Sequence, residues 1–481
     1  MSKYEAVIGL EVHIQVKSAS KMFCSCPNSF GDEPNTNVCP VCMGYPGVLP
    51  VPNHEAIRKT VIAGLLTNCE ISRFSKFDRK SYFYPDMPKN YQISQYDLPF
   101  CLAGHLDISG TGFSGQMLPN KRIGITRIHL EEDVAKLTHY GKCSGVDYNR
   151  AGVPLMETVS EPDMNSADEA YAYLTSLKEI MQYGGISDCD MEKGQMRCDV
   201  NISLRPVGET KLGTKIELKN LNSFRAVHRA IEFEIERQAQ MLDDNIPLRQ
   251  ETRGWNDDRG ESYLMRTKEQ AHDYRYFPDP DLMPVIFTDE EIDAYRAQLP
   301  ELPAAKRARF VSDMGLTEYD AEVITQDRVL ADYFDAAAVG AKNPKSIANW
   351  IISELLREVA AAGISLAECK VTPLQLAGLM KLVDDKVING KIAKEVFAEM
   401  FASGGNAEDI VKTRGLVQVS DSSVIVEFAQ SAIAGNPKQV EQFKNGNEKI
   451  LQYLVGQVMK LSKGKANPQL ASEILKDLLS K

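Results

Sequence analysis

Two hydrophobic patterns divide this chain. Up to about residue 295, short segments alternate apolar and polar residues, which is typical of strands with one buried face, and a few helices lie between them. Beyond a proline-rich stretch, helical spacing replaces the alternation. The pattern predicts an α+β protein with an antiparallel-sheet domain over residues 1–295, a helical domain over 296–405 and a small helical tail over 406–481, joined by a flexible linker that starts at Ala402.

Two helices of the first domain have clear end signals. Ser166 can cap one of them and Glu169, three residues later, can close a capping box. This helix should stop at Gly184 and Gly185. A second helix should follow Ser223.

Several predicted strands carry potential ligands on their polar face. In IGLEVHIQ the residues Glu11, His13 and Gln15 share one face, because side chains alternate across a strand. Three further segments each place several polar residues on one face. These residues are Arg127, His129 and Glu131 in the first segment, Asp199, Asn201, Ser203 and Arg205 in the second, and Lys215, Glu217 and Lys219 in the third. We expect these strands to be ribs of one antiparallel sheet.

Two interpretations of this polar face stay open. Crowded carboxylates repel one another unless cations lie between them, and carboxylate oxygens with an imidazole suit Mg²⁺ or Mn²⁺, ions that commonly bridge nucleotide phosphates. A face that is simply wetted by water would instead favour Lys, Thr and Gln. The sequence holds no P-loop and no GxGxxG motif to decide between them.

Four of the ten cysteines fall within FCSCPNSFGDEPNTNVCPVC, as Cys24 and Cys26 in a CxC pair and Cys39 and Cys42 in a CxxC pair. Two close pairs separated by a loop can supply four thiolates to a structural zinc ion. The segment 24–42 is therefore predicted to be a zinc knuckle, and four thiols without metal are the alternative. The sequence shows no export signal and no apolar run of about 18 residues, so we expect a cytoplasmic protein that does not enter a membrane.

The segment KSYFYPDMPKNYQISQYD mixes aromatic and basic residues, among them Lys80, Tyr82, Lys89 and Gln92. This mixture suits a nucleotide or the end of a nucleic acid. The alternative is an ordinary loop whose tyrosines pack on the domain.

Charge is distributed unevenly along the chain. The formal net charge is −11, which by itself discourages phosphate binding. Residues 411–481, however, hold ten Lys or Arg against six acids, which makes this tail locally +4. The asymmetry indicates an acidic body with a small basic module.

Taken together, IGLEVHIQ, the two cysteine pairs, KSYFYPDMPKNYQISQYD, IHLEEDVAK, YNRAGVPLMETVSEPD and CDVNISLR resemble the B subunits of the heterotrimeric aspartyl/glutamyl-tRNA amidotransferases, GatCAB. The resemblance covers essentially the whole chain. Its end, GQVMKLSKGKANPQLASEILKDLL, resembles the YqeY-like tail of those subunits.

The resemblance implies an enzyme that converts the acid on Glu-tRNA(Gln), or Asp-tRNA(Asn), into its amide. It implies a glutamine-synthetase-like kinase site in the first domain, which uses ATP with Mg²⁺ or Mn²⁺ to phosphorylate the side-chain carboxylate. It also implies a glutaminase A subunit that supplies ammonia and a small C subunit, and this sequence has no Ser-Ser-Lys amidase signature of its own.

By matching positions, the resemblance implies catalytic and metal-binding roles for Glu11, His13, Glu131, Glu157 and Glu217, with Asp199 and Ser203 as further metal ligands. Other positions are implied to meet substrate: Lys80, Tyr82, Lys89 and Gln92 at the aminoacylated end, Arg150 at phosphate, and Lys460, Lys463 and Lys465 at the tRNA elbow. A non-catalytic tRNA-binding subunit and a stand-alone ATP-dependent ligase are the competing hypotheses. The acidic face argues against the first, and the helical region and tail argue against the second.

Overall fold

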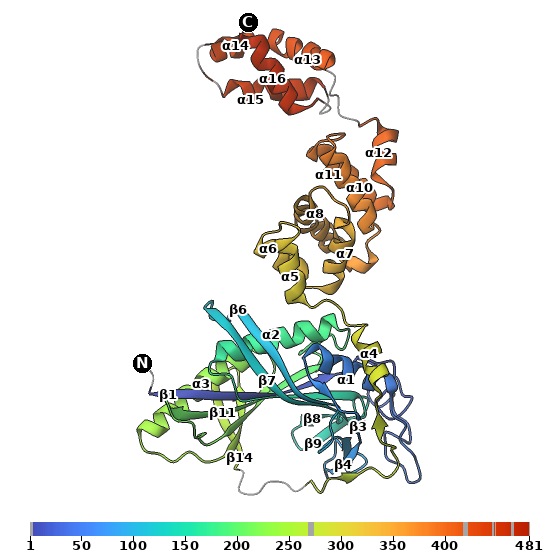
Figure 1. Cartoon of the computed structure of the whole chain (residues 1–481), viewed down its shortest axis with the longest axis vertical. Helices are drawn as coiled ribbons and strands as arrows, with labels where there is room; N and C mark the ends of the chain where they lie inside the picture. Colours follow the sequence, from blue (N-terminus) through green and yellow to red (C-terminus); the bar gives the residue numbers. More distant parts are fainter. Residues whose placement is uncertain are drawn as a thin grey trace. The chain divides into compact units, whose positions relative to one another are not determined.

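The computed structural model describes residues 3–267, 274–416, 422–444, 447, 449–462 and 466–480. The chain forms two compact units, Met1–Leu302 and Pro303–Lys481 (Figure 1). The first unit mixes a large sheet with helices, and the second is helical in its described part. The predicted α+β class, with a helical C-terminal region, is confirmed.

The first unit is built on a nine-stranded sheet. Its strand order is β14 (Glu261–Thr267), β13 (Glu251–Asn256), β12 (Ile216–Leu221), β11 (Met196–Pro206), β1 (Tyr4–Gln15), β10 (Pro154–Ser160), β7 (Met117–Glu132), β6 (Cys101–Thr111) and β2 (Glu70–Ile71). All neighbouring strands are antiparallel except β12 and β13, which run parallel. The polar-faced segments form β1, β7, β11 and β12, so their predicted membership of one sheet is confirmed, but the parallel pairing of β12 with β13 makes that sheet mixed and not wholly antiparallel.

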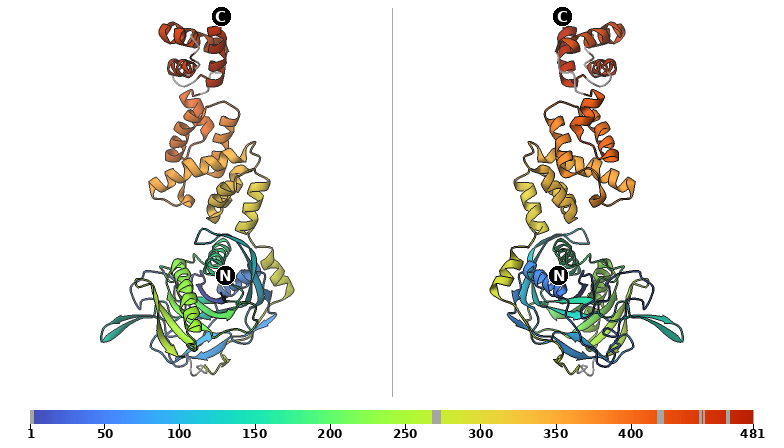
Figure 2. Two further views of the ribbon diagram at one scale, coloured as in Figure 1. Left: turned by 90° about the vertical axis from the view of Figure 1, so that its left-hand side faces the viewer. Right: turned by 90° about the vertical axis from the view of Figure 1, so that its right-hand side faces the viewer.

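Three helices cover the apolar face of this sheet (Figures 1 and 2): α1 (His54–Leu66), α2 (Ala167–Tyr183) and α3 (Phe224–Asp243). Leu10, Val12 and Ile14 of β1 are buried in the core that the helices complete. Burial of one face fixes the strand register, because a one-residue slip would turn these side chains toward the opposite face.

The predicted caps form, with one difference. Ser166 accepts a hydrogen bond from the backbone N–H of Glu169, and Ser223 caps α3 in the same way. The Glu169 carboxylate, however, accepts the backbone N–H of Asn165 instead of that of Ser166, and it also pairs with Lys121. The reciprocal half of the capping box is therefore replaced by an ion pair.

Smaller sheets surround the polar face. A three-stranded sheet joins β4 (Asp78–Ser81), β5 (Tyr91–Ser94) and β15 (Phe277–Pro278), and β3 (Phe74–Ser75) pairs with β16 (Val285–Ile286). The strands β8 (Lys136–Tyr140) and β9 (Cys143–Asp147) form a hairpin that projects from the unit in teal (Figure 2). Strand β5 packs against β7, which brings Lys80 and Gln92 toward the main sheet.

The first unit extends past the predicted end at residue 295. Helix α4 (Asp289–Arg296) packs against α1, and Ile292 is buried in the core of the sheet domain. Tyr295, Leu299 and Leu302 pack on the same core. The boundary falls after Leu302 because these apolar side chains continue the first core beyond the prolines.

The second unit contains two hydrophobic cores. The first core joins α5 (Pro303–Ser312), α6 (Glu318–Thr325), α7 (Arg328–Ala338), α8 (Pro344–Trp350), the π-helix Ile351–Leu355, α9 (Leu356–Ala362), α10 (Pro373–Asp384), α11 (Gly390–Ser403) and α12 (Ala407–Arg414). The second joins α13 (Ser422–Ala434), α14 (Pro437–Lys444), α15 (Ile450–Leu461) and α16 (Pro468–Ser480). Ala407, Ile410 and Val411 are buried in the first core. This segment was predicted to hold the end of the linker and the start of the tail, but it belongs to the packed helices of the first core.

Replacing Phe334 with alanine should destabilise the helical unit strongly. The Phe334 ring is buried and lies edge-to-face against Phe310, with ring centroids 4.8 Å apart. Loss of such a ring leaves a cavity and should lower the free energy of unfolding by about 3–5 kcal/mol. Chemical denaturation of the full chain, with hydrogen exchange to assign the transition, would measure this loss. Leu374→Ala is the control because Leu374 is 77% exposed, and equal effects of both variants would contradict the prediction.

Among the described residues, no helix is both long enough and apolar enough to cross a lipid bilayer.

Candidate active site

Three adjacent strands bring His13, Glu131 and Glu157 together on the polar face. In the strand register His13 of β1 lies opposite Glu157 of β10, which lies opposite His129 of β7. His13 Nε2 is 3.2 Å from Glu157 Oε2. One ligand atom from each of His13, Glu131 and Glu157 lies within 4.8 Å of the other two. We call these three residues the histidine cluster.

The histidine cluster is enclosed by polar and basic groups. Ser94 of β5 donates a hydrogen bond of 2.9 Å to Glu131 Oε2. His129 Nε2 lies 3.6 Å from Glu131 Oε2 and 3.8 Å from Glu157 Oε2, and its buried Nδ1 has no partner within the described part of the chain. Glu131 is only 3% exposed. Glu131 therefore sits inside the protein, and Glu157 is partly buried, so this part of the face is not simply wetted by water.

Both carboxylates of the cluster favour their charged form. Burial alone would raise the pKa of Glu157, but the positive charge of His129 and the contact with His13 hold it well below its usual range. Burial opposes ionisation of Glu131 too, yet His129 and Lys80 lower its pKa. Burial lowers the pKa of His13, but the hydrogen bond and charge of Glu157 raise it above the ordinary histidine value. Ionised oxygens at this spacing could hold a metal cation.

A second cluster lies next to the first on the same face and consists of Glu11, Asp199 and Glu217, with one ligand atom of each within 4.8 Å of the others. We call it the carboxylate cluster. Its members are held by neighbours: Asn201 Nδ2 donates to Glu11 Oε1 at 2.9 Å, Thr252 Oγ1 donates to Glu217 Oε2 at 2.7 Å, and Lys219 pairs with both Asp199 and Glu217. Glu217 is only 8% exposed.

Ser203 lies outside both clusters. It sits opposite Val7, four residues from Asp199 along β11, and a strand rises about 3.3 Å per residue, so the two positions are about 13 Å apart. The alternation of β11 predicted its face correctly. Its distance from Asp199 along the strand, however, separates Ser203 from the other metal ligands that the resemblance implied.

The residues implied to meet substrate separate into two groups. Lys80 faces the histidine cluster, where the charges of Glu131 and Glu157 raise its pKa despite the opposing effect of burial. Lys89 and Gln92 instead hold the neighbouring Glu132, Lys89 through an ion pair and Gln92 through a 2.6 Å hydrogen bond to its backbone oxygen.

Tyr82 and Arg150 belong to neither of the two clusters. The partly buried Tyr82 ring lies 6.0 Å from the ring of Tyr84. Arg150 Nε and Nη2 donate to the backbone oxygens of Val134 and Ala135 at 2.9 and 3.1 Å. Its guanidinium therefore positions a loop, which weighs against the implied contact with phosphate.

Asp133 is a centre of contacts that the motifs did not identify. It is buried directly after β7 and receives hydrogen bonds of 2.8 Å from both Gln15 Nε2 and Arg197 Nη2, while Arg150 Nε lies 3.5 Å away. Burial opposes its ionisation, but the two arginines lower its pKa. The only signal in the sequence was the run of three acids in IHLEED. Asp133 also accounts for Gln15, whose place on the polar face the strand pattern left unexplained.

The four clustered cysteines converge as predicted. The sulfur atoms of Cys24, Cys26, Cys39 and Cys42 all lie within 4.8 Å of one another. A hydrogen bond from Cys24 lowers the pKa of Cys42 to about 4, and Lys21 contributes to the same effect. The Lys21 ammonium is buried, and its Nζ lies 3.8 Å from Cys42 Sγ. A buried cation beside four thiols fits a negatively charged metal–thiolate centre, so these residues could hold a metal ion.

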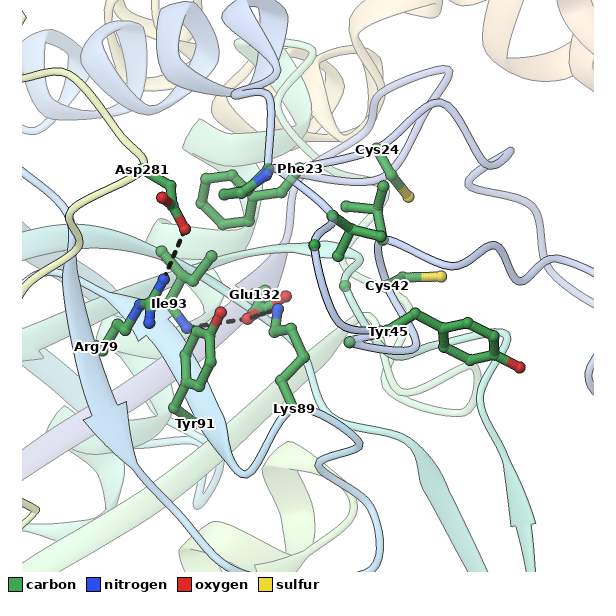
Figure 3. Close-up of a pocket in the computed structure, with 16 residues that line it drawn as sticks. Phe23, Cys24, Cys42, Tyr45, Arg79, Lys89, Tyr91, Ile93, Glu132 and Asp281 are labelled. Carbon is green, nitrogen blue, oxygen red and sulfur yellow. Dashed lines mark hydrogen bonds and ion pairs between the residues drawn. The ribbon is translucent and has the colours of Figure 1, made fainter.

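A cavity of about 190 Å³ lies between the cysteine segment and residues of β4, β5 and the end of β7 (Figure 3). Cys24 and Cys42 line one side of it, and Lys89, Tyr91 and Glu132 line the other. A side chain at Gly44 would collide with Lys89, at 2.6 Å from its Cγ. The cysteine segment therefore packs closely against Lys89. Lys89 forms the ion pair with Glu132, and Glu132 directly follows Glu131 in the sequence.

Two clusters of candidate metal ligands on one sheet, beside a separate four-thiol site, are the arrangement expected of a metal-dependent enzyme. Comparison with known proteins identifies the family. Residues 6–293 match the model described as "GatB/GatE catalytic domain", and residues 332–479 match the model described as "GatB domain".

Known relatives match this chain along their full length. The chain is 55% identical over 480 residues to the B subunit of the aspartyl/glutamyl-tRNA(Asn/Gln) amidotransferase of Thermoanaerobacter pseudethanolicus. It is 53% identical over 486 residues to the protein of the same name from Carboxydothermus hydrogenoformans, and 52% identical over 481 residues to that from Solidesulfovibrio magneticus. Each match covers 100% of both chains. The chain belongs to the GatB family of amidotransferase B subunits, and the resemblance drawn from its motifs is confirmed.

Proposed function

We propose that this chain is the ATP-dependent subunit of a tRNA amidotransferase that converts Glu-tRNA(Gln), and Asp-tRNA(Asn), into Gln-tRNA(Gln) and Asn-tRNA(Asn). The observation that carries the proposal is the pair of half-buried ligand clusters on the polar face, in a chain whose full-length relatives are named amidotransferase B subunits. A purely RNA-binding subunit would have no use for so many closely spaced carboxylates, because their mutual repulsion costs free energy unless cations offset it.

Two steps account for the conversion. In the first, an oxygen of the substrate carboxylate attacks the γ-phosphorus of ATP. The bond from that phosphorus to the bridging oxygen breaks, and ADP leaves with the electron pair. In the second, ammonia attacks the acyl carbon and phosphate leaves, taking one proton from the nitrogen. Phosphorylation is needed because a carboxylate is a poor electrophile and has no competent leaving group.

The geometry supports specific roles for the polar face. Glu11, His13, Glu131, Glu157, Asp199 and Glu217 would hold Mg²⁺ or Mn²⁺, ions that offset the negative charge of the phosphates when bound. Lys80, partly buried beside Glu131 and Glu157, would place a positive charge near the reacting carboxylate. Cys24, Cys26, Cys39 and Cys42 would hold a structural zinc ion, because all four tetrahedral positions are filled by thiolate.

The proposal requires partners. A glutaminase A subunit would supply the ammonia, and a small C subunit would complete a heterotrimer in the cytoplasm. The relatives are named as B subunits of an amidotransferase, which supports a complex of several subunits. The tail would bind tRNA through its basic side chains. Lys460 lies in the last turn of α15, while Lys463 and Lys465 lie outside the described residues.

A trapping experiment tests the function. The complex would be mixed with Glu-tRNA(Gln) and ATP labelled in the γ-phosphate, with no glutamine or ammonia present. Label should appear on the aminoacyl group, and added ammonia should release it as phosphate while glutaminyl-tRNA forms. Amide formation without a labelled acyl phosphate would reject the kinase role.

Truncation after Leu416 should weaken tRNA use selectively. This cut keeps α12 and the first helical core intact and removes the second core, which carries Lys460. Because basic residues contribute much of the affinity for the phosphate backbone, the KM for tRNA should rise by about tenfold or more while ATP binding is unchanged. Steady-state kinetics with varied tRNA and an ATP-binding assay would measure both. Equal losses would contradict a separable tRNA-binding tail.

A further inference from the structure

We propose that Arg197 binds a non-bridging oxygen of the phosphoryl group during its transfer from ATP to the substrate carboxylate, and that Asp133 positions this arginine. The inference rests on the proposed function and adds a residue that neither the motifs nor their resemblance assigned a role.

The position of Arg197 is central to the site. It lies on β11 directly opposite His13, while Asp199, two residues later on the same face, lies opposite Glu11. Arg197 therefore stands in the row where the histidine cluster meets the carboxylate cluster. An anion held between cations bound at the two clusters would lie within reach of this side chain.

Asp133 fixes the orientation of the guanidinium. Its buried carboxylate accepts a 2.8 Å hydrogen bond from Arg197 Nη2. Gln15 Nε2 donates to the other carboxylate oxygen at 2.8 Å, and Arg150, whose Nε and Nη2 donate to backbone oxygens, lies beside it. An arginine held at one end in this way loses little conformational freedom when the rest of its planar fork meets a ligand.

The remaining donors of Arg197 have no acceptor among the residues that the structure describes. Of its five N–H groups, only one makes a hydrogen bond within the described part of the chain, the one to Asp133. Nε is buried and has no partner among the described residues. A donor without an acceptor costs free energy, so a ligand oxygen that meets the exposed end of the guanidinium would satisfy N–H groups that the described residues leave open. The side chain is 39% exposed, which leaves the fork accessible from the site.

The chemistry of the ligand follows from the transferred group. While the new carboxylate–phosphorus bond forms and the bond to ADP breaks, negative charge is spread over the three non-bridging oxygens. A guanidinium matches two such oxygens better than an ammonium does, because its parallel N–H groups can bind both. Arg150 shares Asp133, but its Nε and Nη2 donate to the backbone oxygens of Val134 and Ala135, whereas Arg197 lies directly opposite His13, so the structure favours Arg197 over the arginine that the resemblance implied.

Substitution of Arg197 in the full complex tests the proposal. Single-turnover formation of the labelled acyl phosphate should fall by about 10²–10³-fold in Arg197→Ala, which is typical of losing one donor to a developing charge. The dissociation constants for ATP and tRNA should change little. Arg197→Lys should recover only part of the rate, and added guanidine should restore part of the rate to the alanine variant. Arg205→Ala is the matched control, because Arg205 lies on the same face of β11 but pairs with Glu5.

The outcomes are distinguishable. Unchanged acyl phosphate formation in Arg197→Ala, with an active wild type, overturns the role of Arg197 alone. A slow variant that neither lysine nor guanidine rescues, and whose melting temperature falls, shows a structural role and also overturns the proposal. Absence of labelled acyl phosphate in the wild type overturns the proposed function itself.

Discussion

Glu131→Gln should reduce acyl phosphate formation by about 10³-fold or more, while glutamine hydrolysis in the partner subunit continues. The substitution keeps the size of the side chain but removes one charge from a cluster whose ligand atoms lie within 4.8 Å of one another. It also places an amide N–H₂ where Ser94 and His129 now meet a carboxylate oxygen. Loss of a buried cation ligand removes both metal affinity and stabilisation of the transferred charge.

Single-turnover assays with labelled ATP, repeated over a range of Mg²⁺ concentrations, would measure this loss, and the Mg²⁺ requirement should rise. Glu161→Gln is a suitable control. Glu161 directly follows β10 and accepts a hydrogen bond from Thr126, but that contact is exposed. Full phosphorylation by Glu131→Gln at the wild-type Mg²⁺ requirement would refute the assignment of the histidine cluster.

Cys42→Ser should abolish stoichiometric zinc binding and unfold the cysteine segment locally. Cys42 is buried at the centre of the thiol cluster, where its pKa of about 4 makes it the sulfur most readily held as a thiolate. A structural zinc ion contributes about 10–16 kcal/mol in isolated zinc-finger peptides. Without the ion, the buried Lys21 would face a cluster that has lost its charge. Hydrogen exchange in residues 21–48 should accelerate by about 10²-fold or more.

The same variant should also lower phosphorylation, because Gly44 packs on Lys89, which holds Glu132 beside Glu131. Zinc content by elemental analysis and hydrogen exchange by mass spectrometry would measure the primary effect. Cys143→Ser is the control, since Cys143 is exposed and outside the thiol cluster. Retention of one zinc ion per chain in Cys42→Ser would show that the knuckle does not need this ligand.

The helical unit shows why domain boundaries were hard to place from sequence. Glycines and a proline-rich stretch marked breaks near residues 295 and 402, but residues beyond each break pack onto the core that precedes it. Packing of Leu299 and Leu302 on the first core, and burial of Ile410 in the next, decide the boundaries. Such burial depends on which distant surface the helix meets, and local composition does not encode that surface.

The sequence by itself determined the local features of this protein. Period-two alternation placed Glu11, His13 and Asp199 on one face because backbone geometry alone dictates that periodicity. Cysteine spacing identified the thiol cluster for a similar reason, since a short loop brings its two ends together in almost any fold.

Only the tertiary structure decided the site. The insertion of β10 between β1 and β7 sets Glu157 between His13 and His129, and the packing of β5 on β7 closes Ser94 over Glu131. The tertiary structure also separates Ser203 from the ligands, directs Arg150 toward backbone oxygens and brings Arg197 to Asp133. These contacts join residues far apart in the chain, so strand order, register and the pairing of buried charges select them, and none of these is a property of a single segment.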